Sequence, residues 1–122
     1  MSPSDIERVR EILGCIETID RAEATVRRCE GDLDVARVAL DAVHYRVTMI
    51  GEAIESLSLD MREDHPAVPW SDMASMRDLF GHDYDKLDPQ IVRATIGEPV
   101  KHLRAACRAI LAESVRVGED EP

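Results

Sequence analysis

Arg77 and His82 are the two side chains in this sequence whose types and spacing best suit a chemical reaction. Arginine carries a permanent charge on a planar fork of N–H donors, which matches the oxygens of a phosphate group. Histidine has an ordinary pKa near neutrality, so it can accept or donate a proton at physiological pH. Cleavage of a phosphodiester by the 2′-hydroxyl of RNA needs both functions. The pair is therefore a candidate ribonuclease site, with Arg77 stabilising the phosphate and His82 as general acid or base.

These two side chains would not meet on an unbroken α-helix. A separation of five residues, at about 100° per residue, places them about 140° apart around the helix axis. Gly81 directly precedes His82, and glycine commonly ends helices. We expect the helix that carries Arg77 to end at Gly81, so that His82 turns back toward the arginine. Without further context, a salt-bridge arginine and a helix-end histidine are the commoner explanations of these residues.

A longer stretch of the sequence resembles the HepT-like proteins of the HEPN superfamily. The resemblance begins with the pattern Arg-x4-His-x-Tyr, formed here by Arg77, His82 and Tyr84. It extends to three further segments in the same order and approximate spacing: Ile50-Gly51-Glu52-Ala53, Pro66-Ala67-Val68-Pro69-Trp70, and the last helix after Leu87-Asp88. Two positions depart from the pattern. Asp78 stands where the family often has Asn, and Gly81 replaces a commonly aliphatic residue.

The resemblance implies a metal-independent endoribonuclease that is the toxin component of a toxin–antitoxin pair. It also implies a homodimer in which both motifs face one cleft. The implied partner is a cognate minimal nucleotidyltransferase antitoxin, which would inhibit the toxin by transferring AMP from ATP to Tyr84. A bulky anion beside Arg77 would compete with RNA by volume and by charge.

A second function stays open beside this one, a non-catalytic nucleotide- or partner-binding subunit of a nucleotidyltransferase complex. The formal net charge of -10 favours this alternative. Basic residues supply the sequence-independent part of nucleic-acid affinity, and an acidic chain has few of them to spare. Only a test of activity separates the two functions.

Several other residues are candidates for supporting roles. Glu52 and Asp78 could orient Arg77, although a solvated carboxylate explains Glu52 equally well. A basic stripe on the last helix could guide the RNA backbone, although a solvated helix face is the commoner explanation; its members are Arg93, Lys101, Arg104 and Arg108. The histidines and carboxylates show no metal-ligand spacing, so we expect neither a metal nor a cofactor.

Apolar residues at intervals of three and four predict the helices that must position this site. The first begins at the capping-box pattern Ser4-Asp5-Ile6-Glu7 and ends before Gly31. A second, longer helix runs from Asp32 to about Leu59. It contains Gly51, which costs about 1 kcal/mol relative to alanine, and close packing of a neighbouring backbone is the explanation we prefer.

The second half of the chain predicts a loop and two more helices. Residues 60–69 are polar and carry two prolines, which favours a loop. A short third helix would then begin near Ser71 and end at Gly81. Asp88-Pro89 is a good start for the fourth helix, which Gly97-Glu98-Pro99 should kink or interrupt.

Four amphipathic helices with short connections predict an all-α, antiparallel four-helix bundle with a short third helix, and the resemblance implies that this bundle is HEPN-like. Residues 1–117 would form the single domain and residues 118–122 an acidic tail. Aromatic residues make up only 3% of the chain, so the core must be aliphatic. The sequence lacks both an apolar run of roughly 20 residues and a signal-peptide pattern at its start, so we expect a cytoplasmic protein without a membrane span.

Overall fold

The computed structural model describes residues 2–81 and 86–120, with side chains as far as residue 116. Every regular element in these two ranges is a helix. The elements are α1 (Pro3–Arg28), α2 (Leu33–Glu55), α3 (Leu59–Asp64), α4 (Trp70–Ala74), the 3₁₀ helix η1 (Ser75–Phe80) and α5 (Pro89–Asp120). The predicted all-α class is confirmed.

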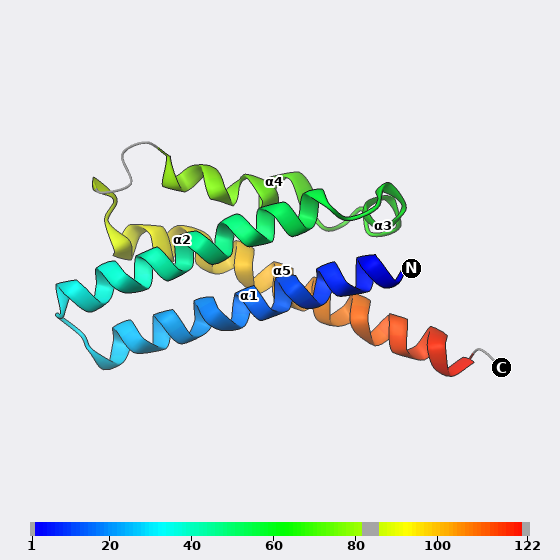
Figure 1. The fold of residues 1–122 in the computed structure, drawn as a ribbon, viewed down its shortest axis with the longest axis horizontal. Coiled ribbons are helices and arrows are strands. Elements are labelled where there is room, and N and C mark those ends of the chain that lie inside the picture. Colours follow the sequence, from blue (N-terminus) through cyan, green and yellow to red (C-terminus); the bar gives the residue numbers. More distant parts are fainter. Residues whose placement is uncertain (1, 82–85, 121–122) are drawn as a thin grey trace.

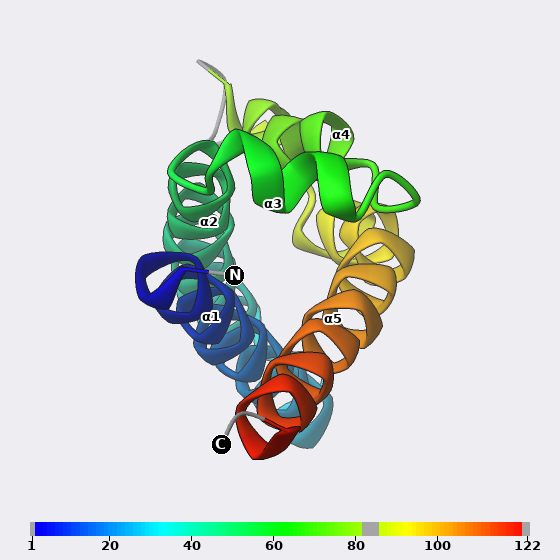
Figure 2. The ribbon, with the colours of Figure 1, turned by 90° about the vertical axis from the view of Figure 1, so that its right-hand side faces the viewer.

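Successive long elements run in alternating directions (Figure 1). Helices α1 and α2 form an antiparallel hairpin, and α4 with η1 then runs back along α2. Helix α5 returns the chain and packs mainly on α1. Seen along the long axis, α3 and α4 lie above the space between α2 and α5 (Figure 2). The short α4–η1 segment thus takes the place of the predicted short third helix.

The helix starts follow from residues that satisfy the first free N–H groups of each helix. Asp32 caps α2 as predicted, because its Oδ1 accepts hydrogen bonds from the backbone N–H groups of Asp34 and Val35 at 3.0 and 3.1 Å. Asp88 caps α5 in the same way, accepting from the N–H of Gln90 at 2.9 Å. The predicted cap of α1 was two residues late. Ser2, not Ser4, accepts the hydrogen bond from the N–H of Asp5 at 3.1 Å.

The prediction of a loop over residues 60–69 was wrong for its first half. Helix α2 ends at Glu55, and Ser58 then starts α3 by accepting a hydrogen bond from the N–H of Met61 at 3.1 Å. The side chain of Asp5 holds this start in place. Its carboxylate accepts hydrogen bonds from the N–H of Ser58 at 2.9 Å and from the Ser58 hydroxyl at 2.6 Å. A contact across 53 residues cannot be seen in a local pattern.

The sequence predicts that Gly97-Glu98-Pro99 kinks or interrupts the last helix. Helix α5 is not interrupted, and it continues through Pro99. Proline lacks the N–H that would donate to the carbonyl of Thr95, so the helix loses one hydrogen bond there. Buried side chains on both sides hold the helix against the core: Ile96, Val100 and Leu103 are at most 4% exposed. Helix α5 also extends to Asp120, beyond residue 118. The division into a domain and an acidic tail stays a prediction.

The core is aliphatic, as the composition predicts, and it is shared by the three long helices. Each fully buried Ile or Leu side chain contributes about 1.5 to 3 kcal/mol to the free energy of folding relative to an exposed one. The largest of the side chains that are less than 2% exposed are Ile12, Ile16, Ile19, Ile50, Ile54, Ile96, Leu103 and Ile110. From the α4–η1 segment, Trp70, Met73, Met76 and Phe80 close one side. No helix within the described ranges is long and apolar enough to cross a membrane.

Candidate active site

Arg77 lies in the middle of η1, at the edge of the bundle beside α2. Met76 and Phe80, which flank it in η1, are buried and attach the segment to the core. The side chain of Arg77 is 37% exposed, so solvent and ligands reach it. The apolar residues of η1 therefore hold the segment in place while the arginine stays accessible.

Gly51 on α2 is the point where the α4–η1 backbone comes closest. A Cβ atom at this position would lie 3.2 Å from the carbonyl oxygen of Ala74, and 3.4 and 3.5 Å from Cδ and Nη1 of Arg77. The first distance is tighter than ordinary contact, and it involves backbone rather than a flexible side chain. The prediction that Gly51 marks close packing is confirmed, and the segment packed there is the one that carries Arg77.

Glu55 is the direct partner of Arg77. Nη2 of Arg77 donates a hydrogen bond to Oε1 of Glu55 at 2.5 Å, and the glutamate side chain is 51% exposed. This hydrogen bond and the charge of Glu55 raise the pKa of the Arg77 guanidinium, with smaller contributions from Asp78 and Glu52. The arginine is therefore fully charged at any pH at which the protein functions.

The sequence pattern predicts Glu52 and Asp78 as residues that could orient Arg77, but it does not predict Glu55. The structure brings both of the named carboxylates within electrostatic reach of the guanidinium. Their orienting role stays a prediction, since the printed hydrogen bond goes to Glu55. A signal for Glu55 was available. Glu55 lies four residues after Gly51, so the two residues share one face of α2. If Gly51 faces a neighbouring segment, Glu55 faces the same segment.

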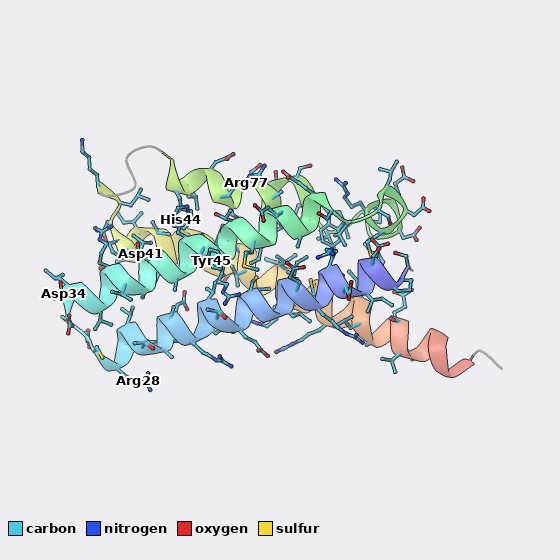
Figure 3. All side chains as sticks on the ribbon, in the orientation of Figure 1. Arg28, Asp34, Asp41, His44, Tyr45 and Arg77 are labelled. Atoms are coloured by element: carbon cyan, nitrogen blue, oxygen red, sulfur yellow. The ribbon has the colours of Figure 1, made fainter. Side chains whose placement is uncertain are left out.

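His44 is a second residue at this face of α2 that the sequence pattern does not predict as part of the site. Its ring stacks on Phe80, the last residue of η1, with ring centroids 4.6 Å apart and planes 13° from parallel. Figure 3 labels His44 and Arg77, and both side chains lie between α2 and the α4–η1 segment. An imidazole therefore packs on the end of η1, two residues before His82.

His82 and Tyr84 lie outside the described residues, as do Asp83 and Asp85. The expected approach of His82 to Arg77, and the role of Tyr84 as a modification site, therefore stay predictions. Helix η1 ends at Phe80, with Gly81 as the next residue, as predicted. The φ of Gly81 is −40°, so the turn does not use the left-handed conformation that favours glycine.

The basic stripe of α5 lies against a different helix from Arg77. Nη2 of Arg104 bonds both carboxylate oxygens of Asp20 on α1, at 2.6 and 2.7 Å. Lys101 and Arg104 also line a small pocket between α5 and α1, together with Asp20 and Glu23. Arg93 is half-buried, and Lys101 and Arg108 are exposed. Carboxylates of α1 thus offset part of the charge of the stripe, and its role toward RNA stays a prediction.

Within residues 2–81 and 86–116, no three His, Cys, Asp or Glu side chains come together in a way that could hold a metal ion. The charged groups around Arg77 are instead the carboxylates of Glu55, which bonds it, and of Asp78 and Glu52. What this arrangement offers chemically is a fixed, exposed positive charge suited to an anion.

Comparison with known proteins places this arrangement in a family. The family model described as "Ribonuclease HepT-like" matches residues 12–110, which include Arg77, His82 and Tyr84. A Thermococcus cleftensis protein named "Probable ribonuclease HepT" is 31% identical over 104 residues, 85% of this chain and 93% of its own length.

Two further relatives match shorter shares of their own lengths. A Methanocaldococcus jannaschii protein named "Gamma-glutamylcyclotransferase and putative RNase" is 30% identical over 105 residues, which cover 86% of this chain but only 46% of that protein. A "Putative RNase" of Caldanaerobacter subterraneus is 36% identical over 63 residues, 52% of this chain and 56% of its own length. No solved structure matches. The all-helical fold and these matches together show that the chain belongs to the HepT-like ribonuclease family of the HEPN superfamily.

Proposed function

We propose that this protein is a metal-independent endoribonuclease and the toxin component of a toxin–antitoxin pair. One observation carries the proposal: a fully charged, accessible guanidinium is held at the edge of the bundle, in the segment that leads into His82. Membership of a ribonuclease family supports the same reaction class. A buried or fully enclosed Arg77 would have argued against it.

The proposed reaction uses RNA's own 2′-hydroxyl as the nucleophile. His82 removes the proton as the 2′-oxygen attacks phosphorus, and the bond from phosphorus to the 5′-oxygen breaks. The leaving 5′-oxygen takes up a proton from water, so the products are a 2′,3′-cyclic phosphate and a 5′-hydroxyl. Arg77 binds the non-bridging oxygens, whose negative charge increases in the transition state. In the proposed homodimer, the motifs of two subunits would line one cleft.

Cleavage assays with purified protein test this function. Wild-type protein should cut a labelled RNA in the presence of EDTA. Arg77→Ala and His82→Ala should each lose about 100-fold or more in rate, as expected for loss of a group that stabilises transition-state charge and of a general acid or base, respectively. Circular dichroism should show that both variants stay helical. Cleavage that survives in both variants would contradict the proposed site, and binding of a nucleotide or of the nucleotidyltransferase without any RNA cleavage would support the binding-subunit alternative.

We propose further that a cognate minimal nucleotidyltransferase inhibits the enzyme by transferring AMP to Tyr84. An adenylyl group near Arg77 would place its own phosphate where RNA must bind. The intact mass of the protein, measured after incubation with the partner and ATP, should increase by one AMP group. Tyr84→Phe should show no such increase. A modified Tyr84→Phe protein would move the site to another residue.

A further inference from the structure

The C-terminal turn of α2 carries an unusual placement of charge. Glu52 and Glu55 both lie in this last turn, and the turn contains no basic residue. The C-terminal end of a helix has a partial negative charge, so carboxylates there are unfavourable unless a cation lies close by. Arg77 of η1 is that cation, since it bonds Glu55 directly. Arg77 therefore offsets part of the negative charge at the end of α2.

Two contacts define how the guanidinium lies on this surface. Gly51 leaves room for Cδ and Nη1 of Arg77, which would be 3.4 and 3.5 Å from a Cβ atom at this position. Glu55 accepts a hydrogen bond from Nη2, the other terminal nitrogen of the Arg77 guanidinium. One edge of the planar group is thus engaged by α2. A guanidinium has five N–H donors, so one carboxylate oxygen does not exhaust them.

We propose that Glu55 is a positioning residue for the cleavage reaction, holding one edge of the Arg77 guanidinium on α2 so that its other N–H groups meet the RNA phosphate. This inference rests on the proposed function of Arg77. A long arginine side chain has many rotamers, and a fixed acceptor selects among them before RNA arrives. Glu55 never touches the RNA in this scheme, and its effect passes through Arg77.

The hydrogen bond and the charge of Glu55 make opposite contributions to catalysis. The hydrogen bond orients Arg77, which promotes the reaction. The negative charge lies beside an anionic substrate, which weakens binding. Replacement of Glu55 by Gln keeps an acceptor oxygen and removes the charge, whereas replacement by Ala removes both. The two variants therefore separate orientation from electrostatics.

The test measures kcat and KM for cleavage of a labelled single-stranded RNA by wild-type protein and four variants. Glu55→Ala should lower kcat about tenfold and change KM by less than about threefold, because orientation of a group in the transition state is lost. Glu55→Gln should recover at least half of the wild-type kcat, with a KM no higher than that of wild type. Glu17→Gln is the matched control: it makes the same change of charge at an exposed position of α1 and should leave both constants unaltered.

Arg77→Ala is the fourth variant, and it separates the two ways of failing. If Arg77→Ala cleaves RNA as fast as wild type, the proposed function is overturned and the inference about Glu55 with it. If Arg77→Ala is inactive while Glu55→Ala keeps the wild-type kcat, only the inference is overturned. A Glu55→Gln variant as slow as Glu55→Ala would also overturn it, because the retained acceptor would then have no orienting effect.

Discussion

A single residue without a side chain determines how Arg77 is presented. Gly51 costs α2 some helix stability, and in return the backbone of η1 packs directly on the helix. Arg77 then lies within reach of Glu55, one turn further along the same face. The glycine, the arginine and the glutamate act as one unit, because each contact depends on the closeness that Gly51 allows.

Replacement of Gly51 by Ala tests this unit. The added Cβ would lie 3.2 Å from the Ala74 carbonyl oxygen, so η1 must shift. We expect a loss of about 1 to 3 kcal/mol in the free energy of unfolding, as for other overpacked sites, and a loss of about tenfold or more in kcat. Urea denaturation and RNA cleavage measure the two effects.

Gly14→Ala is the matched control for this substitution. Gly14 lies inside α1, where a Cβ atom meets nothing within 4 Å. Alanine should stabilise the helix there by up to about 1 kcal/mol and leave cleavage unchanged. If Gly51→Ala behaved like Gly14→Ala, close packing at Gly51 would have no functional consequence.

Among the helices, the shortest ones depend most on contacts with distant parts of the chain. Helix α3 has six residues, too few to be stable alone. Its start is held by Asp5 of α1, a carboxylate only 4% exposed that accepts two hydrogen bonds from Ser58. Burial by itself would raise the pKa of Asp5, but the hydrogen bonds from Ser58 and Ser2 outweigh it and lower the pKa below its ordinary value of 3.8.

This lowered pKa predicts a dependence of stability on pH. The folded protein favours the ionised form of Asp5, so the stabilisation is complete above pH 3.8 and is lost as the pH falls through the lower pKa of the folded state. At pH 7, Asp5→Ala should lower the free energy of unfolding by about 1.5 to 3 kcal/mol, the range for hydrogen bonds to a charged group. The difference from wild type should shrink in acid.

Denaturation of Asp5→Ala, Ser58→Ala and the double variant checks the assignment. The two single effects should not fully add, because the hydrogen bond from the Ser58 hydroxyl to Asp5 is lost in both variants, whereas the one from the Ser58 N–H is lost only in Asp5→Ala. Additive losses, or a difference from wild type that is independent of pH down to acid denaturation, would show that Asp5 stabilises the protein in another way.

The molecule as a whole is acidic, and its basic side chains differ in how free they are to bind an anion. Its net charge is -10, so under the proposed function RNA would be attracted by local rather than overall charge. On α5, Arg104 is bound to both oxygens of Asp20, while Lys101 is exposed. A cation already paired with a carboxylate releases less binding free energy to a phosphate than a solvated one.

If the basic stripe guides RNA, this difference predicts which residue matters more. Lys101→Gln should raise KM about threefold and make it less dependent on salt, as expected when one phosphate contact is lost. Arg104→Gln should change KM less and instead lower stability by up to about 1 kcal/mol, since it removes a largely surface ion pair. Measurements of KM between low and high salt decide the order. A larger effect from Arg104→Gln would reverse the assignment.

The sequence by itself determined the helical class, most helix starts and the identity of the family. Apolar spacing and caps such as Asp32 act within one or two turns, so they can be read without a fold. The pattern of Arg77, His82 and Tyr84 has the same local character. The spacing of these three residues indicates the ribonuclease family without any knowledge of the contacts in the fold.

Tertiary structure alone decided which groups surround Arg77 and how the short helices are held. Glu55 lies 22 residues from Arg77 in the chain, and Asp5 lies 53 residues from Ser58. Such pairs form only when helices pack at a particular rotation and depth, and Gly51 sets that depth at the site. Periodicity shows that a face is buried, but it does not specify the residue that meets it from another helix.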